Sequence, residues 1–231
     1  MWIACFSVFL SGCSSTTRPD GSTTMIYGTC GKDPKYSAAI PIHRFARFPV
    51  TVSVNVSSAV ISSPAWLANC RDALALGAGA WAEVMTGGVG QVTVSRDNPA
   101  ALIQMTLETV SADSVAGTEN HRGSDLVTSA AISIYRYWNA DLDQSAIFGS
   151  PGTYEPPVDR GTLPLATWKG YLAGIAAHEM GHAFFAGGHP PVDDTLMSSP
   201  NATYVVMGPR PDYQSYFSVS DRNTMNEAYC R

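Results

Sequence analysis

The chain has 231 residues, of which 45% are hydrophobic, so it is long and apolar enough to form one globular domain with a sizeable core. Only 14% of the residues are charged and the net charge is -5, which leaves no basic patch to neutralise phosphates and argues against a nucleic-acid partner. Beyond residues 1–12, no apolar run resembles a transmembrane helix.

Residues 1–12, MWIACFSVFLSG, form an apolar run that is typical of a signal peptide rather than of folded structure. The residues LSGC, which end at Cys13, resemble the lipobox of bacterial lipoproteins, and this resemblance implies a lipid anchor on Cys13. The alternative is an ordinary secretory signal. Both interpretations place the protein outside the cytoplasm, in the bacterial cell envelope or secreted. Residues 13–44 are expected to be a tether and an N-terminal segment, with the Ser/Thr-rich stretch 14–25 flexible.

Three further cysteines, Cys30, Cys70 and Cys230, lie beyond this signal. An exported chain meets an oxidising compartment, so a structural disulfide among them is expected. Because three cysteines cannot all pair within one chain, the sequence leaves the pairing open.

The body of the domain is expected over 45–231. Strands are predicted over four segments that alternate apolar and polar residues or are rich in β-branched ones: 50–56, 91–95, 101–107 and 130–138. A helix with an apolar stripe is predicted over 65–85. Residues 108–129 have weak periodicity and are expected to form a loop with at most an edge strand, and 139–166 a second, long loop. This order predicts an α/β fold, in which helices pack against a sheet.

A second long helix is predicted to start at Thr167, as its cap, and to end at the glycine pair Gly187 and Gly188. One inward stripe of this helix follows helical spacing: Leu172, Ile175, Glu179 and His182. The helix carries the segment AHEMGHAFFAGGH over 177–189, which holds three of the five histidines of the chain.

The spacing of these histidines indicates a metal site. His178 and His182 are four positions apart, so on a helix both imidazoles project from one face and reach a single ion. This is the HExxH pattern of zinc peptidases. A catalytic zinc ion takes three protein ligands and leaves its fourth position for water, and His189 is the expected third ligand. Glu179 is then placed to take a proton from the zinc-bound water as a general base.

The longer segment AHEMGHAFFAGGHPPVDDTLMSSP resembles the matrixin branch of the metzincin zinc metallopeptidases, whose pattern is HExxHxxGxxH followed by a Met-turn. Met197 stands eight residues after His189, as in that family, and residues 218–229 are similar to its final helix. The resemblance implies a zincin-like fold with a twisted, mostly parallel sheet, an active-site helix and a C-terminal helix. It also implies one catalytic zinc ion on three histidines, with Met197 as a hydrophobic floor beneath it.

The spacing departs from the family pattern at one point, because His189 follows His182 by seven positions instead of six. The expected explanation is a helix that runs one residue longer and turns at Gly187 in a left-handed conformation, which still delivers His189 to the metal. Two alternatives stay open. Either Asp193 or Asp194 supplies the third ligand, or the site is degenerate and binds no metal.

Other residues carry less weight as ligands. Neither His43 nor His121 is expected to bind the metal. Calcium has no complete ligand pattern in the loop 139–166, where a solvated loop is favoured for the three candidates Asn139, Asp141 and Asp143. Cys30 lies in GTCGKDP, which resembles the cysteine switch of matrix metallopeptidases, although a structural disulfide is the favoured role.

These features predict an exported zinc metalloendopeptidase that cleaves extended polypeptides lying along an edge strand. The alternative is a catalytically inactive zincin-fold surface protein that binds a partner through the same cleft. We expect a monomer that contacts a polypeptide substrate, touches the membrane only through its lipid anchor and binds no nucleic acid.

Overall fold

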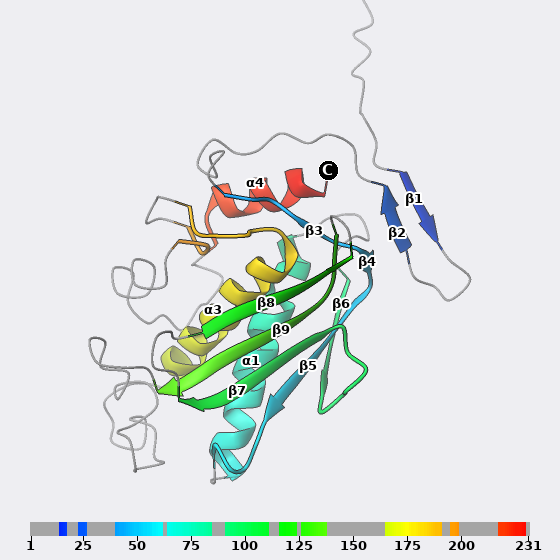
Figure 1. Cartoon of the computed structure of the whole chain (residues 1–231). Coiled ribbons are helices and arrows are strands. Elements are labelled where there is room, and N and C mark those ends of the chain that lie inside the picture. The colour runs from blue at the N-terminus through cyan, green and yellow to red at the C-terminus, as the bar shows by residue number, and fades with distance from the viewer. Residues whose placement is uncertain are drawn as a thin grey trace, which may run out of the picture.

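The computed structural model describes residues 14–17, 23–26, 40–61, 64–84, 91–110, 116–123, 126–137, 165–190, 195–198 and 217–229. Among these residues, a mostly parallel sheet is covered on one face by two long helices (Figure 1). No helix in the described part of the chain is both long and apolar enough to cross a bilayer. The α/β class that the order of elements predicted is therefore confirmed.

Four parallel strands form the centre of the sheet, in the order β9, β7, β5, β6. Their bounds are Val50–Val56 for β5, Val92–Arg96 for β6, Ile103–Val110 for β7 and Leu126–Tyr137 for β9. The short strand β3 (Arg44–Phe45) pairs in parallel with the start of β9. Strand β8 (Ala116–Gly123) pairs with β9 antiparallel, and no other described strand pairs with it.

The two long helices lie behind the sheet in the view of Figure 1. Helix α1 (Pro64–Val84) connects β5 to β6, as a parallel crossover requires. Helix α3 (Leu165–Phe184) lies against α1, and α4 (Val219–Ala228) closes the described chain. The two long helices approach most closely at Gly77, where a Cβ atom would lie 2.2 Å from the Ala173 carbonyl oxygen. Glycine is therefore required there because of space rather than backbone conformation.

The expected strand and helix at the start of the domain are present nearly as predicted. In β5 the valines that alternate along the strand are all buried: Val50, Val52, Val54 and Val56. Helix α3, in contrast, begins two residues before Thr167, so this threonine lies in the first turn and is not the cap. Cys70 is buried in α1, whereas Cys30 and Cys230 lie outside the described residues.

The expectation of a loop over 108–129 is wrong for most of these residues, whereas the possible edge strand within it is present as β8. Strand β7 extends to Val110, strand β8 occupies 116–123, and β9 begins at Leu126 instead of residue 130. The bounds of β8 could not be predicted, because its side chains are exposed or half-buried and no apolar alternation marks them. Its partner is β9, and pairing between strands, rather than local propensity, makes it a strand.

The expectation of a flexible tether is also wrong for part of 14–25. Strands β1 (Ser14–Thr17) and β2 (Thr23–Ile26) pair antiparallel, and β2 pairs with β4 (Arg47–Phe48) in a small separate sheet (Figure 1). Threonine is β-branched and favours strands, which the composition-based expectation overlooked. Cys13 and the signal peptide lie outside the described residues and stay predictions.

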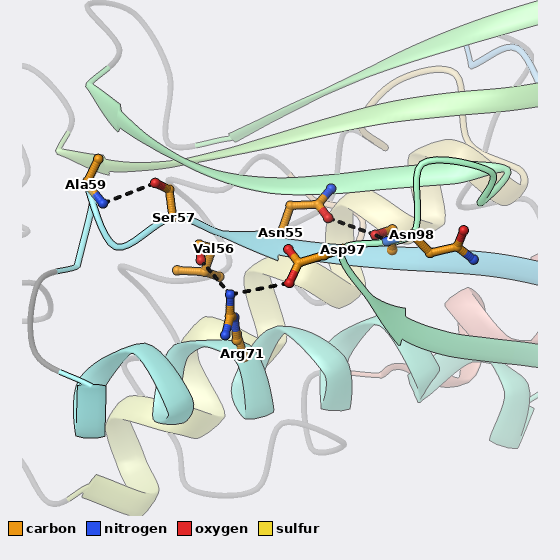
Figure 2. A network of polar contacts seen from close by, with 8 residues as sticks. Asn55, Val56, Ser57, Ala59, Arg71, Asp97 and Asn98 are labelled. Atoms are coloured by element: carbon orange, nitrogen blue, oxygen red, sulfur yellow. Dashed lines mark hydrogen bonds and ion pairs between the residues drawn. The ribbon is translucent and has the colours of Figure 1, made fainter.

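A polar network ties α1 to one end of the sheet (Figure 2). The Arg71 guanidinium of α1 donates a 3.0 Å hydrogen bond to the carbonyl of Val56, the last residue of β5. The same group lies 3.5 Å from the carboxylate of Asp97, which follows β6 and adopts a left-handed φ of 49°. The backbone N–H of Asn98 donates to the Ser53 hydroxyl at 2.8 Å. These contacts hold the crossover between β5 and β6 in place.

Candidate metal centre

The C-terminal end of α3 meets three other parts of the chain, which satisfy its last carbonyl groups. Such carbonyls have no partner within a helix and need one from outside. The His182 carbonyl accepts hydrogen bonds from His43 Nε2 at 2.7 Å and from the Asn120 amide at 2.9 Å. The Phe184 carbonyl accepts one from the Tyr229 hydroxyl at 2.7 Å. The end of the helix is therefore held by the N-terminal segment, β8 and α4.

The chain after α3 turns back along residues 41–43. The N–H of His43 donates to the Phe185 carbonyl at 2.9 Å, and the N–H of Gly187 donates to the Pro41 carbonyl at 2.8 Å. Between them, Ile42 and Ala186 form an antiparallel bridge. This pairing directs the following residues towards the histidines of α3.

The predicted role of Gly187 is wrong in two respects. Helix α3 ends at Phe184 rather than running longer, and the φ of Gly187 lies outside the left-handed range. Glycine is needed here because a Cβ atom would lie 2.9 Å from the Pro41 carbonyl oxygen. The extra residue before His189 is thus accommodated by pairing with the N-terminal segment, which no local pattern reveals.

The structure brings His178, His182 and His189 together. Each pair of their Nε2 atoms is 3.1 Å apart. Nitrogen ligands about 2.0 to 2.1 Å from a tetrahedral zinc ion lie roughly 3.3 Å from one another, so the triangle has a suitable size. Among the described residues, these three histidines form the group of potential ligands that is compact enough to hold a metal ion.

Hydrogen bonds orient two of the rings. The Nδ1 atoms of His178 and His182 lie 2.5 Å from the Leu196 carbonyl and 2.8 Å from the Ala186 carbonyl. A carbonyl only accepts, so each Nδ1 carries the proton and each Nε2 presents its lone pair to the cluster. Two lone pairs that converge on the Nε2 atom of a third imidazole suit a cation, which is the first sign that these residues fit a metal.

The electrostatics keep the imidazoles neutral, as metal ligands must be. Burial lowers the pKa of His178 well below its usual range, and the neighbouring His182 and His189 lower it further. Burial also lowers the pKa of His182, and burial together with His182 lowers that of the more exposed His189 to about 4. At neutral pH all three imidazoles are therefore uncharged.

Glu179 is buried beside the cluster, with 2% of its surface exposed. Its carboxylate accepts a 2.6 Å hydrogen bond from the Thr118 hydroxyl of β8. Burial raises the pKa of Glu179 to about 7, and the Thr118 hydrogen bond opposes that rise. Such a carboxyl group exchanges a proton readily near neutral pH. Sequence reasoning selected Glu179 but missed Thr118, because the edge strand allowed within 108–129 had no predicted bounds.

Met197 is fully buried next to the helix that carries the histidines. Its sulfur occupies the space above Gly181, where a Cβ atom would come within 2.2 Å of it. The preceding residue, Leu196, supplies the carbonyl that orients His178. The turn around Met197 therefore packs against the helix that carries the histidines and orients the His178 ring.

Asp221 holds that turn in place and was also missed. Its buried carboxylate accepts hydrogen bonds from the backbone N–H groups of Leu196 at 2.6 Å and Met197 at 3.3 Å. It also accepts from the Ser218 hydroxyl at 2.9 Å, while the Ser218 hydroxyl accepts from the N–H of Asp221 at 3.0 Å. This is a capping box, and the pattern Ser-x-x-Asp at 218–221 was the signal available in the sequence.

His43 is not in the cluster but supports it. Its Nε2–H donates to the His182 carbonyl, and its Nδ1 accepts from the Arg122 guanidinium at 3.1 Å. Burial is the main cause that lowers the pKa of His43 to about 4, so the ring stays neutral. His121 is exposed on β8 and lies outside the cluster. Among the described residues, neither histidine belongs to the cluster that is compact enough to hold a metal ion.

A cleft of about 580 Å³ opens beside the three Nε2 atoms. One wall is β8, through 116–120 and Arg122, and the other is the end of α3 with 186–189. Both Glu179 and His182 line it. An elongated ligand in this cleft would therefore lie along β8 and pass the three clustered histidines.

Searches of known protein families and of curated proteins find no match to this chain. Function must then be argued from the geometry of the cluster and the cleft. Several predicted candidates lie outside the described residues: Cys13, Cys30, Asn139, Asp141, Asp143, Asp193, Asp194 and Cys230.

Proposed function

We propose that this protein is a zinc metalloendopeptidase of matrixin-like metzincin fold, which hydrolyses peptide bonds in extended polypeptides. One observation carries the proposal: three neutral imidazoles converge within 3.1 Å of one another beside the buried carboxylate of Glu179, in a cleft bordered by an edge strand. Two contacts support the likeness to matrixins. Met197 packs against Gly181 of α3, and Asp221 of the capped helix α4 accepts a hydrogen bond from the backbone of Leu196, next to Met197.

Zinc is the metal that fits this donor set best. Neutral imidazole nitrogens suit zinc, whereas calcium and magnesium prefer oxygen ligands. His178, His182 and His189 would hold the ion through Nε2. When bound, zinc would supply Lewis-acid chemistry, polarising the scissile carbonyl and lowering the pKa of a water molecule.

Glu179 is the residue that would move protons in this reaction. Its Oε2 is held by Thr118, so its other oxygen, Oε1, is the one that would take a proton from the attacking water. The same carboxyl group would then pass that proton to the nitrogen of the leaving amine. A group whose pKa lies near 7 can both accept and release the proton at neutral pH.

The substrate class follows from the edge of the sheet. Strand β8 pairs with β9 on one side, and no described strand pairs with its other side. An extended peptide can add to such an edge through main-chain hydrogen bonds, which demands little of its sequence. A polypeptide segment in the cleft would thus place a peptide bond near the metal and Glu179.

The test is cleavage of a peptide library by the purified full chain, with and without a zinc chelator. We expect cleavage that the chelator abolishes, and a loss of about 100-fold or more for Glu179→Ala, as for removal of a general base. The variant should keep one zinc ion per chain. Glu108→Ala, on β7 and outside the cleft, is the control that should cleave normally.

Two other results have clear meanings. Zinc binding without any cleavage by the wild-type chain would favour the inactive binding protein. Equal cleavage by Glu179→Ala and the wild type would show that the hydrolysis does not come from this site.

We also propose that the protein is exported and carries a lipid anchor at Cys13, and that it acts as a monomer. The apolar run over 1–12 and the LSGC sequence support export and anchoring. Membrane partitioning of Cys13→Ser checks the anchor, because the variant should be released into the soluble fraction.

A further inference from the structure

We infer that Thr118 is a positioning residue for Glu179, which fixes the carboxylate in the orientation that presents one oxygen to the cleft. This inference rests on the proposed function and adds a residue of β8 to the machinery. Two side chains of β8, Thr118 and Asn120, bond the active-site helix beside the three histidines, and Thr118 is the one that reaches the Glu179 carboxylate.

The hydrogen bond has an unambiguous direction. The Thr118 hydroxyl oxygen lies 2.6 Å from Glu179 Oε2 and 3.1 Å from the Glu179 backbone carbonyl. A hydroxyl has one proton, and of its two neighbours the carboxylate oxygen is both the nearer and the stronger acceptor. Thr118 thus holds Glu179 through its carboxylate.

The two carboxylate oxygens of Glu179 have different surroundings. Thr118 is the only hydrogen-bond partner of this carboxylate among the described residues, and it contacts Oε2. Oε1 has no such partner. It is also absent from the buried, unpartnered polar atoms among the described residues, so it retains some exposure to solvent. Oε1 is therefore the oxygen that water in the cleft can reach.

Threonine is well suited to this task on an edge strand. Its β-branched side chain has few χ1 rotamers, so the hydroxyl direction follows from the backbone. The backbone is set by antiparallel pairing of Thr118 with Ile132 of β9. Side chains alternate along a strand, and Thr118 and Asn120, two positions apart, both contact backbone carbonyls of α3. A glutamate has three rotatable bonds and needs such an external contact to stay in one orientation.

The consequence for the reaction is specific. Without the hydroxyl, the Glu179 carboxylate can rotate, so fewer molecules present Oε1 to the attacking water at any moment. Peptide binding along β8 uses main-chain groups and is not affected by this rotation. Loss of the Thr118 hydroxyl should therefore lower kcat and leave KM and zinc binding nearly unchanged.

A pair of matched variants tests this inference in the full chain. Thr118→Val removes the hydroxyl and keeps the shape, and Thr118→Ser keeps the hydroxyl. With a peptide that the wild type cleaves, we expect kcat to fall about 10- to 100-fold in the valine variant, as for loss of a partner that orients a functional group. KM should change by less than about 3-fold, and the serine variant should recover most of kcat.

Thr128→Val is the matched control, because Thr128 is exposed on the neighbouring strand and its hydroxyl contacts only the His121 carbonyl. It should cleave as the wild type does. Crystal structures provide a readout without turnover: the Glu179 carboxylate should occupy more than one position in Thr118→Val and one position in Thr118→Ser.

Unchanged kcat in Thr118→Val, or an equal loss in the serine variant, would overturn the role of Thr118 while leaving the peptidase assignment intact. A single unchanged position of the Glu179 carboxylate in the Thr118→Val crystal would do the same. If the wild-type chain itself cleaves no peptide, the proposed function fails and the inference fails with it.

Discussion

Asp221 links the start of α4 to the turn that supports the metal cluster. Its carboxylate accepts from the backbone of Leu196 and Met197, and the Leu196 carbonyl in turn accepts from Nδ1 of His178. A buried carboxylate with several donors is stable only while each donor remains paired. The orientation of one metal ligand therefore depends on a residue in the last helix.

Replacing Asp221 with alanine should weaken both the fold and the metal site. The buried N–H groups of Leu196 and Met197 would lose their acceptor, at a cost of about 3 kcal/mol or more in the free energy of unfolding. Zinc affinity should fall about 10- to 100-fold, because the carbonyl that orients His178 would no longer be fixed. Denaturant unfolding of the metal-free chain and zinc titration measure the two effects separately.

Ser218→Ala serves as a comparison for this prediction. It removes the cap hydroxyl of α4 but leaves the carboxylate of Asp221 on the turn, so the expected loss is only about 1 kcal/mol. Zinc affinity should stay near that of the wild type. Equal effects of the two variants on zinc affinity would show that Asp221 acts on the helix alone.

The crossing of α1 and α3 sets the position of α3, the helix that carries His178 and His182. Gly77 has no room for a side chain there, because a Cβ atom would lie 2.2 Å from the Ala173 carbonyl oxygen and 2.6 Å from the Ala176 Cβ. Both obstacles belong to α3, one a backbone atom and the other a short side chain. The helices cannot approach as closely with any residue other than glycine at this position.

Gly77 and Gly79 of the same helix form a matched pair for mutation. Gly77→Ala should destabilise the protein by about 1 to 3 kcal/mol, because the added methyl group forces α1 and α3 apart. In Gly79→Ala the added Cβ meets nothing within 4 Å, so helix propensity should stabilise the protein by about 0.5 to 1 kcal/mol. Thermal unfolding of both variants gives the comparison, and shifts in the same direction would contradict this account of the crossing.

The sequence was informative where the structure is local. Helical spacing predicted that His178 and His182 project from one face, and apolar alternation predicted β5, because each pattern repeats within a few residues. Strand β8 has no such repeat, since its side chains are largely exposed and its partner β9 defines it. Because the bounds of this strand could not be predicted, the contact between Thr118 and Glu179 could not be predicted either.

Across the whole molecule, distant segments meet around the end of α3. The Tyr229 hydroxyl accepts a hydrogen bond from the N–H of Phe45 at 2.9 Å and donates to the Phe184 carbonyl at 2.7 Å. The rings of Phe48, Phe184 and Tyr229 pack together there, with centroids 5.5 to 6.0 Å apart. This packing holds the N-terminal segment in position to pair with the residues that lead to His189.

The route to His189 shows what a single sequence does not contain. The spacing of seven positions after His182 left the third ligand open. Residues 41–43 pair with 185–187, which are far away in sequence, and this pairing precedes the turn that brings His189 to the other two histidines. A departure from a family spacing therefore has to be judged together with the segment that pairs with it.

The most direct test of the metal centre is zinc X-ray absorption on the full chain loaded with one equivalent of zinc. We predict three imidazole nitrogens at about 2.0 to 2.1 Å from the ion. His189→Ala should remove one imidazole from the spectrum, whereas His121→Ala, which changes an exposed histidine outside the cluster, should leave it unchanged. Fewer than three imidazoles in the wild-type chain, or an unchanged spectrum in His189→Ala, would contradict the three-histidine site.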